Sequence, residues 1–453
     1  MANLKITEMT ENTSPALEDL IETVNDPSGT PLTRKVTLQN ITGLAQIAVS
    51  AYGVQWDEDL AGPTLARTGA LKGLTAAESP GNASLPIQAA MKRCILSDAG
   101  VVQYYLYATD STLKEDGTTA SVLDGTDGQV MVEIPKFAYK YSYDAAANIH
   151  DWSISSVLLP GYEWHPAFYK DGAWVDNRYI GAYEGIGYDD GTSAYVNCGT
   201  GKADNWAGGS IDLANDKLGS VSGFAPMMDE TRAEFRAIAL NRGVGWRQQD
   251  FYLMSAIQLL YLVEYASFYS QDVIGMGRTE LSGGTWVKDS YIGVTGKSNS
   301  DGNATANTGG NTNNAYMSYR GIENFYGNLW KWVDGFNIND NIPYVSNTET
   351  DFADDTDTNY TRLTDTGGSG ITLINAGGWQ TTLEQTKGGF LPSAVGGGSS
   401  STYITDYYYQ AADWRVAALG GDAYYGDVAG FFYWALSAAS TADDVDFGSR
   451  LCF

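Results

Sequence analysis

The chain has 453 residues, of which 43% are hydrophobic and 18% charged, a balance typical of folded domains rather than of disordered segments. Its formal charge is −27, because 54 acidic residues outnumber 27 basic ones. This excess of acid argues against sequence-independent nucleic-acid binding, which needs basic patches to neutralise phosphates.

Residues 1–50 begin as a polar, acidic segment without a basic, hydrophobic start, so we expect no signal peptide. Asp26 to Pro31 is a cluster of turn-forming residues, and Leu32 to Ile41 follows it. We interpret residues 1–50 as an arm that ends in a short strand or helix.

Residues 51–135 have the composition of a β-rich module. Val101 to Tyr107 is β-branched and aromatic, which predicts a strand, and Gln129 to Pro135 predicts a second strand that Pro135 closes. We therefore predict a β-rich intermediate domain at 51–135 and a larger domain at 136–453.

The few residues suited to metal or redox chemistry are far apart. Three cysteines (Cys94, Cys198 and Cys452) fit neither a disulfide framework nor a zinc spacing, and packed thiols are the simplest interpretation. His165 precedes Pro166 in an aromatic stretch typical of a structural histidine. We expect no catalytic residue, no metal and no cofactor.

Residues 229–268 carry the helical signals. Asp229 or Thr231 can cap a first helix, with Gly243 as its C-terminal cap. A second helix from about Asp250 to Phe268 is apolar over most of its circumference, so we expect it to be buried between layers. Its apolar run is too short to span a bilayer, which argues against membrane insertion. Two helices followed by a strand-rich segment predict an α+β fold.

Three polar segments predict surface loops, at 297–314, 348–365 and 396–401. The second segment holds an acidic cluster that Ca²⁺ or solvent could occupy, although the cluster lacks the order of an EF-hand loop. Its members are Asp351, Asp354, Asp355 and Asp357.

The run from Arg320 to Gly335 is dense in aromatic residues, Gly and Asn. Its Trp330-x-Trp332-Val pattern has the period of two of a half-buried strand, and Gly327 and Asn328 supply a turn that tolerates positive φ. We expect Trp330 and Trp332 to lie in or beside the core.

From Ile404 to Phe453, segments with clear strand and turn patterns alternate with other positions. These other positions share no residue type and follow no regular spacing of apolar residues. Such positions are typical of exposed loops. We call them the soft positions; they are Asp422, Tyr424, Tyr425, Val428, Ala435, Ser437, Ala438, Ala442, Asp444 and Asp446.

The Gly-Asn-Leu-Trp-Lys-Trp run at 327–332 resembles the Gly-Asn-x-Trp-Glu-Trp signature of a C-type-lectin-like fold, in its formylglycine-generating and phage-diversified branch. Lys331 stands where the signature has Glu, and Ser449 replaces Phe in the closing Gly-Phe-Arg motif at 448–450. The resemblance covers roughly 170–453 and implies a set of scaffold residues. These are Asn328, Trp330, Trp332, Trp414 and Arg450.

Three families share that fold, so the fold alone does not decide the function. The formylglycine-generating oxidase needs two nearby cysteines for copper, whereas only Cys452 lies in the C-terminal region. The calcium-dependent lectins use Glu-Pro-Asn or Gln-Pro-Asp together with Trp-Asn-Asp, and none of these triplets occurs here.

The third family is the variable protein of diversity-generating retroelements, and the frame of residues 411–450 resembles its variable region. Adenine-directed copying of Asn codons yields Tyr, Asp, Ser, Ala or Val, which are the residue types at the ten soft positions. Residues 31–38 and 128–137 also resemble phage tail proteins. The resemblance implies a virion-attachment and trimerisation segment at 1–50.

The resemblance therefore implies a homotrimeric receptor-binding protein of a phage tail, made in the host cytoplasm and carried on the virion. Its partners would be other tail proteins and a bacterial surface receptor, and it would not be an enzyme. Three alternatives remain open: an enzyme of the formylglycine-generating type, a tail-associated hydrolase, and a structural tail protein with a fixed, loop-rich tip.

Overall fold

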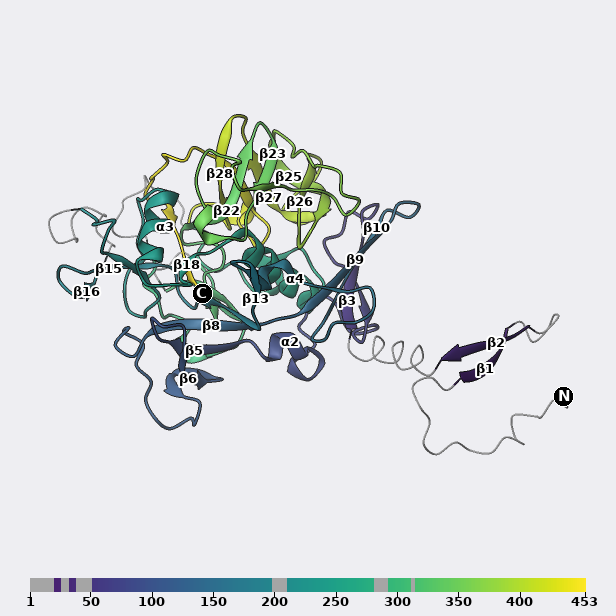
Figure 1. Cartoon of the computed structure of the whole chain (residues 1–453), viewed down its shortest axis with the longest axis horizontal. Helices are drawn as coiled ribbons and strands as arrows, with labels where there is room; N and C mark the ends of the chain where they lie inside the picture. Colours follow the sequence, from purple (N-terminus) through teal and green to yellow (C-terminus); the bar gives the residue numbers. More distant parts are fainter. Residues whose placement is uncertain (1–19, 26–31, 38–50, 198–209, 281–291, 311–313) are drawn as a thin grey trace.

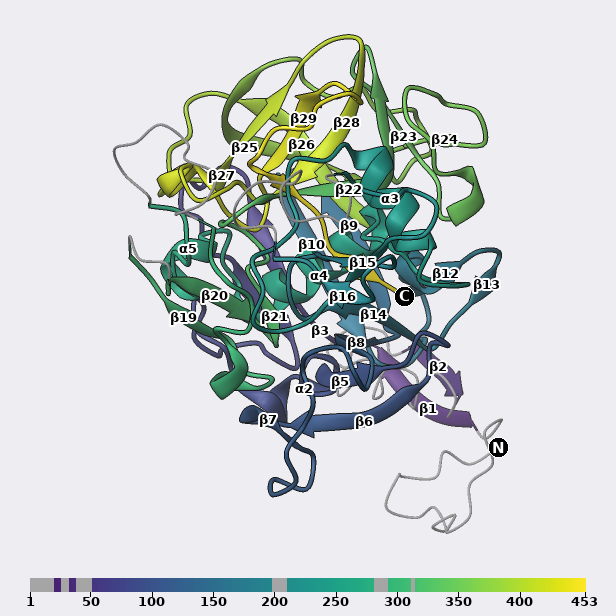
Figure 2. The ribbon, with the colours of Figure 1, turned by 90° about the vertical axis from the view of Figure 1, so that its left-hand side faces the viewer.

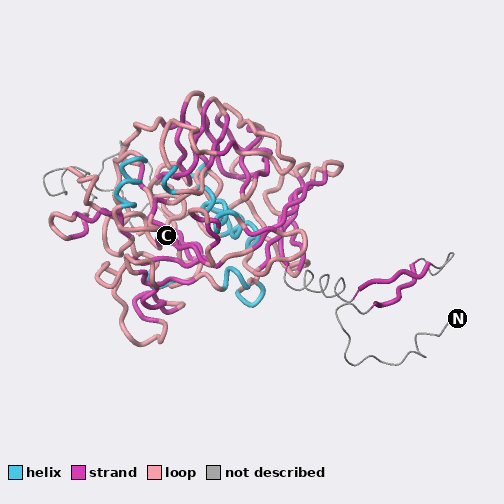
Figure 3. The backbone as a smooth tube through the Cα atoms, in the orientation of Figure 1, coloured by secondary structure: helices cyan, strands magenta, loops and turns pink. Residues whose placement is uncertain are grey.

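The computed structural model describes residues 20–25, 32–37, 51–197, 210–280, 292–310 and 314–453. The protein is mostly β-sheet with few helices, and Figure 3 shows strands throughout its body. The helices that the sequence predicts are present, but they are a minor part of the fold. None of the described helices is both long and apolar enough to cross a membrane.

A seven-stranded antiparallel sheet joins the beginning, middle and end of the body. Its order is β18-β31-β14-β8-β5-β6-β7. The strands are β18 (Arg247–Gln248), β31 (Leu451–Cys452), β14 (Asn177–Gly181), β8 (Gln129–Pro135), β5 (Lys92–Leu96), β6 (Val102–Tyr107) and β7 (Asp110–Lys114). Because β8 is buried on both faces, its apolar run Val-Met-Val suits a central strand.

A five-stranded sheet, in the order β11-β9-β10-β3-β4, lies beside it. The strands are β11 (Glu163–Trp164), β9 (Ala138–Asp144), β10 (Ile149–Ser155), β3 (Ala51–Asp57) and β4 (Ala66–Gly69). β3 pairs with β10 along its whole length, and β8 pairs with β14. Both sheets thus cross residue 135, and 51–135 is not the separate module that the sequence predicted. The turn signals and the Pro that suggested a boundary are only strand ends.

A nine-stranded sheet carries most of the last third of the chain and lies at the top of Figure 1. Its path is β24-β23-β22-β28-β29-β27-β25-β26, and β30 pairs in parallel with β22. The strands are β22 (Trp330–Asn339), β23 (Ile342–Val345), β24 (Thr361–Arg362), β25 (Gly377–Thr386), β26 (Gly389–Val395), β27 (Ile404–Gln410), β28 (Trp414–Leu419), β29 (Trp434–Ala438) and β30 (Phe447–Gly448).

Helix α4 (Phe251–Tyr265) lies between the nine-stranded and seven-stranded sheets, as Figure 2 shows, and all its residues are buried. The Asp250 side chain caps it by accepting from the Leu253 N–H at 2.9 Å. The prediction of a helix buried between layers is confirmed.

Helix α3 (Arg232–Leu240) begins with a capping box formed by Thr231 and Glu234. Its C-terminal cap is Asn241, so the prediction of Gly243 as the cap was wrong. The chain leaves the helix two residues earlier, and Gly243 instead follows the first turn after it, with φ 142°.

The remaining elements are short. They are β1 (Leu20–Asn25) and β2 (Leu32–Thr37), which form a hairpin; α2 (Pro86–Ala89), β12 (Tyr169–Lys170), β13 (Ala173–Trp174), β15 (Ile186–Asp189), β16 (Ala194–Tyr195), β17 (Lys217–Gly219), α5 (Ser270–Val273), β19 (Ala306–Thr308), β20 (Tyr316–Tyr319) and β21 (Ile322–Glu323); and the 3₁₀ turns at 82–84, 166–168, 299–301, 349–351 and 426–428.

Candidate binding face

The soft positions lie on strand β29 of the nine-stranded sheet and in the loops that follow β28 and β29. Side chains alternate across β29: Trp434 and Leu436 are buried in the core around α4, where Trp434 lies 5.7 Å from the Phe251 ring. Ala435 and Ser437 therefore lie on the other side of the sheet, which we call the outer face.

A β-bulge extends this face by one residue. Val416 of β28 is opposite Ala438, whereas Ala418 is opposite Ala435, so β29 contains one more residue than β28 between the two pairs. Because of this extra residue, the Ala438 side chain lies on the same face of the sheet as the Ala435 side chain. Both alanines pack against the cluster that contains Val416 and Ala418.

An aromatic floor lies beneath the outer face. Its members are Trp330, Trp332, Tyr407, Tyr433 and Phe447. Trp330 meets Tyr433 edge to face at 4.7 Å, and Phe447 stacks on Trp332 at 4.2 Å with an angle of 14° between the rings. Tyr407 reaches Tyr433 at 5.8 Å. Such pairs contribute beyond their buried area, so the floor is a rigid support.

The structure gathers half of the predicted positions over this floor. Val428, Ala435, Ala438 and Ala442 pack partly buried against the cluster that contains Trp330 and Tyr433. The Tyr425 ring stands edge to face on Trp330 at 4.9 Å and is 38% exposed.

The prediction that all ten positions are exposed loop residues was wrong in two respects. Asp422 is fully buried, and Ala435, Ser437 and Ala438 belong to a strand. Tyr425 and Asp444 are exposed, and the remaining seven positions are half-buried. The small side chains of this strand show no alternation of apolar and polar residues in the sequence. The large rings beneath them, rather than the alanines, fill the buried space, so the alanines carry no such pattern.

Asp422, which is buried, and Asp446, which is half-buried, form an acidic pair beside the floor. Asp422 accepts from the Tyr424 N–H at 2.7 Å, which shapes the turn that presents Tyr424 and Tyr425. Burial and the neighbouring carboxyl group raise the pKa of Asp422 well above its usual range, and burial raises that of Asp446 to about 6. The other groups acting on Asp422 and Asp446 are Lys331, which favours the charged form of Asp422, and Asp444, which opposes that of Asp446.

Because the pKa values of this pair are raised in the folded protein, we expect the stability of the protein to fall as the pH rises. Both folded-state pKa values exceed the value of about 3.9 for an unfolded Asp, so the folded protein binds more protons between about pH 4 and 7. We expect Asp422→Asn, which keeps an oxygen acceptor for Tyr424, to stabilise the protein by on the order of 1–2 kcal/mol at pH 7.5. At pH 4 the variant should match the parent chain. Calorimetric melting at both pH values checks this, and an equal change at both would contradict it.

Lys331 points away from the outer face and is buried. Its Nζ lies 3.1 Å from Glu184 Oε1 and donates to the Gly327 carbonyl at 2.5 Å. Burial lowers its pKa to about 8, although Glu184 opposes the shift. Lys331 thus forms an internal ion pair with Glu184. The sequence alone did not indicate its partner Glu184.

The other residues predicted as scaffold differ in burial. Asn328 has φ 61°, as expected of its turn, and its side chain donates to Glu184 at 2.5 Å. Arg450 is buried and donates to the carbonyls of Gly181, Glu323 and Asn324. Trp414 begins β28 and is only half-buried.

The acidic cluster at 351–357 is held by protein groups. Asp354 accepts from Arg232 and Arg236, each at 2.5 Å, and Asp355 accepts from the Ser440 hydroxyl at 2.5 Å. Nowhere in the described part of the chain do three or more possible ligands gather as a metal site. The cluster therefore fastens the 348–365 segment to α3 and to the loop after β29.

Cys94 and Cys452 are on the same sheet but three strands apart, on β5 and β31. At roughly 4.8 Å per strand they are separated by about 14 Å, too far to share a metal ion. Burial raises the pKa of the Cys452 thiol to about 11, and the thiol donates to the Gln248 carbonyl. Cys198 lies outside the described residues. His165 is also buried, which lowers its pKa to about 3 and keeps it neutral.

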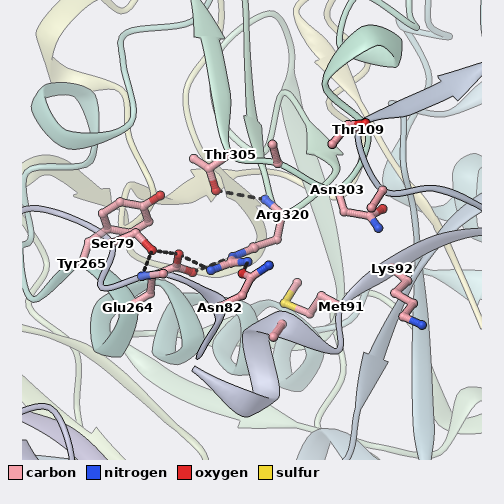
Figure 4. Close-up of a pocket in the computed structure, with 14 residues that line it drawn as sticks. Ser79, Asn82, Met91, Lys92, Thr109, Glu264, Tyr265, Asn303, Thr305 and Arg320 are labelled. Carbon is pink, nitrogen blue, oxygen red and sulfur yellow. Dashed lines mark hydrogen bonds and ion pairs between the residues drawn. The ribbon is translucent and has the colours of Figure 1, made fainter. Parts of the chain in front are cut away.

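A cavity of about 430 Å³ lies apart from the outer face, between α4, β5 and the turn that follows β20 (Figure 4). Its charged groups already bind one another. Arg320 donates to both carboxylate oxygens of Glu264, at 2.6 and 3.0 Å, and Ser79 donates to the same carboxylate at 2.6 Å. Such a satisfied network holds segments together and leaves few groups for a ligand.

Comparison with known proteins finds no family model and no curated protein that matches the chain. The function must therefore be argued from the geometry of the outer face and from the sequence resemblance.

Proposed function

We propose that the chain is the receptor-binding protein of a phage tail, with a C-type-lectin-like α+β fold at its C-terminal end and a retroelement-diversified binding surface. It would bind a host surface molecule, assemble as a homotrimer with other tail proteins, and have no enzymatic activity. The observation that carries this proposal is the gathering of soft positions from two loops and one strand over a single aromatic floor.

The arrangement suits a surface whose side chains change while its backbone stays fixed. Val428, Ala435 and Ala438 are only partly buried against the cluster that contains Trp330, Trp332 and Tyr433, so substitution there removes little buried contact. Tyr425 adds an exposed amphipathic ring of limited flexibility, the kind of anchor that antibody paratopes use.

The burial of Asp422 narrows the proposed contact set. Asp422 supports the Tyr424 turn from below, and the candidates for receptor contact are those with exposed surface. They are Tyr424, Tyr425, Val428, Ala435, Ser437, Ala438, Ala442, Asp444 and Asp446. A single face of this size would bind weakly, and display of three copies on several fibres would raise the avidity.

We expect the double variant Tyr424→Ala/Tyr425→Ala to abolish adsorption of the phage to its host. Its melting temperature should fall by only a few degrees, because Tyr425 is part-exposed and rests on rings that pack without it. Adsorption of virions that carry the variant, with calorimetry of the purified chain, measures both effects. Tyr107→Ala is the matched control, since Tyr107 is 39% exposed on the distant strand β6. Normal adsorption of the double variant would contradict the proposal.

The coding DNA gives an independent test of diversification. Each soft position should have a codon that ends in C or T, and a near-copy with Asn codons should lie beside a reverse transcriptase gene. A GCA or GCG codon at Ala435 or Ala438 would argue against adenine-directed change at that position.

A further inference from the structure

Two cavities meet to form a groove that none of the ten soft positions lines. One has a volume of about 340 Å³ and the other about 620 Å³, and Glu163 and Lys387 line both. Both volumes fall in the range of small-ligand sites, roughly 300–1,000 Å³. The groove is built from β9, β11, the β12–β13 hairpin and the turn between β25 and β26.

The smaller compartment is walled by aromatic rings. Trp174 is 50% exposed and Tyr169 41% exposed, and the two rings meet edge to face at 5.2 Å. Trp164 and Tyr252 complete the wall. Large rings that remain this exposed on a short hairpin contribute little to the stability of the fold, so their exposed surfaces are available to a ligand.

The hairpin that carries these rings is held in place. Its turn residues Asp171 and Gly172 have φ of 50° and 81°, the left-handed conformation that two-residue hairpins require. The Asp171 carboxylate binds Arg247 and accepts from the Glu349 N–H at 2.9 Å. The aromatic wall is therefore preformed.

The opposite wall is fixed as tightly. A Cβ at Gly388 would come within 2.0 Å of Pro166 Cγ, so the turn between β25 and β26 is seated directly on Pro166. The Gly388 N–H also donates to the Tyr139 hydroxyl at 2.9 Å. This contact fixes the neighbouring Lys387 where the two compartments join.

The charges in the groove balance. The smaller compartment contains Glu163 and Lys387, and the larger one adds Asp365 and Lys140. Among the described residues none of these four side chains is in an ion pair. Each compartment thus offers one or two carboxylates and an equal number of ammonium groups, which favours an uncharged ligand with both donors and acceptors over a phosphate or a cationic peptide.

Asn347 supplies a further unsatisfied group in the smaller compartment. Its Nδ2 donates to the Pro166 carbonyl at 2.9 Å, whereas its Oδ1 is buried and accepts no hydrogen bond from any described residue. A buried acceptor without a partner is costly, and a turn of the Asn347 amide toward the compartment would let a ligand hydroxyl satisfy it.

We propose that the groove binds an uncharged oligosaccharide. One sugar ring would lie with its apolar C–H face on Trp174 and Tyr169, with a hydroxyl donating to Asn347 Oδ1. Vicinal hydroxyls would bind Glu163 and Lys387, and the chain would continue into the larger compartment along Thr364 and Thr366. This site is separate from the outer face and would operate whether or not that face is diversified.

The test is calorimetric titration of the full chain with three neutral trisaccharides that differ in linkage or in sugar unit: maltotriose, cellotriose and tri-N-acetylchitotriose. We expect at least one to bind, and Trp174→Ala to weaken that binding at least tenfold without changing the melting temperature, because the ring is half exposed. Lys387→Ala, at the junction of the two compartments, should also weaken it.

Two controls separate this groove from the outer face. Tyr425→Ala and Tyr107→Ala should leave the trisaccharide affinity unchanged, and Trp174→Ala should leave the turn at Tyr424 intact. The proposal is overturned if none of the three sugars binds, if Trp174→Ala retains full affinity, or if inorganic pyrophosphate binds the groove more tightly than the sugars. Failure of the Tyr424 and Tyr425 adsorption test would leave this titration unaffected.

Discussion

Replacing Trp332 with alanine is expected to lower the free energy of unfolding by about 3–5 kcal/mol, the usual cost of removing a large buried ring. Trp332 is fully buried and stacks on Phe447, and its Nε1 donates to the Glu230 carbonyl at 3.1 Å. The substitution leaves a cavity beneath the outer face and a buried carbonyl without its donor. Denaturant unfolding followed by circular dichroism measures the loss. Trp330, 2% exposed, should behave similarly.

Trp414 provides the matched control within the same sheet. It is half-buried at the start of β28 and its nearest ring, Tyr344, lies 6.2 Å away. We expect Trp414→Ala to cost about 1 kcal/mol, since it creates no enclosed cavity. Equal losses of stability for Trp332→Ala and Trp414→Ala would mean that burial does not determine the cost of removing a tryptophan from this sheet.

Replacing Arg320 with alanine is expected to destabilise the protein by a comparable amount, about 3–5 kcal/mol, because it leaves a buried carboxylate without its cation. Glu264 is 1% exposed, and Arg320 supplies two of its hydrogen bonds (Figure 4). Urea unfolding of the variant and the parent chain at pH 7 measures the loss.

Two further variants test whether the buried charge is responsible. Glu264→Gln combined with Arg320→Ala should recover part of the loss, because a neutral amide is less costly to bury than a carboxylate. Lys92→Ala removes a cation from the rim of the same cavity, where its pair with Glu115 is exposed at 3.5 Å, and should cost less than about 1 kcal/mol. A double variant as unstable as Arg320→Ala alone would exclude the charge explanation.

The local signals in the sequence predicted the corresponding elements well. An Asp followed by a nearly continuous apolar run predicted α4, and the Gly-Asn turn before Trp-x-Trp predicted the start of β22. These predictions depend on caps, turns and periodicity, which act over a few residues. The proposed boundary at residue 135 was wrong because β3 pairs with β10 and β8 with β14, and strand pairing across distant segments has no local signal.

The candidate binding face was predictable only in part. Its approximate location followed from positions of mixed residue type, but that argument could not distinguish Asp422, which is buried, from Asp444, which is exposed. Burial of a short polar side chain depends on what covers it. Here Lys331 and Asp446 lie close enough to act on the Asp422 carboxylate, and neither is its neighbour in sequence. The bulge in β29 that places Ala438 on the same face as Ala435 could not be predicted either, because a bulge is defined by the pairing of β29 with β28.

By itself, the sequence determined a folded, acidic chain, its buried helix, its tryptophan strand and the segment in which side chains follow no folding pattern. These properties depend on composition and on interactions between near neighbours. Only the tertiary structure decided that the sheets join 51–135 to the rest, that Lys331 pairs with Glu184, and that Glu163, Trp174, Asn347 and Lys387 line one groove. Those arrangements bring together residues that are up to about 220 positions apart, and their energies depend on packing and burial that no local pattern encodes.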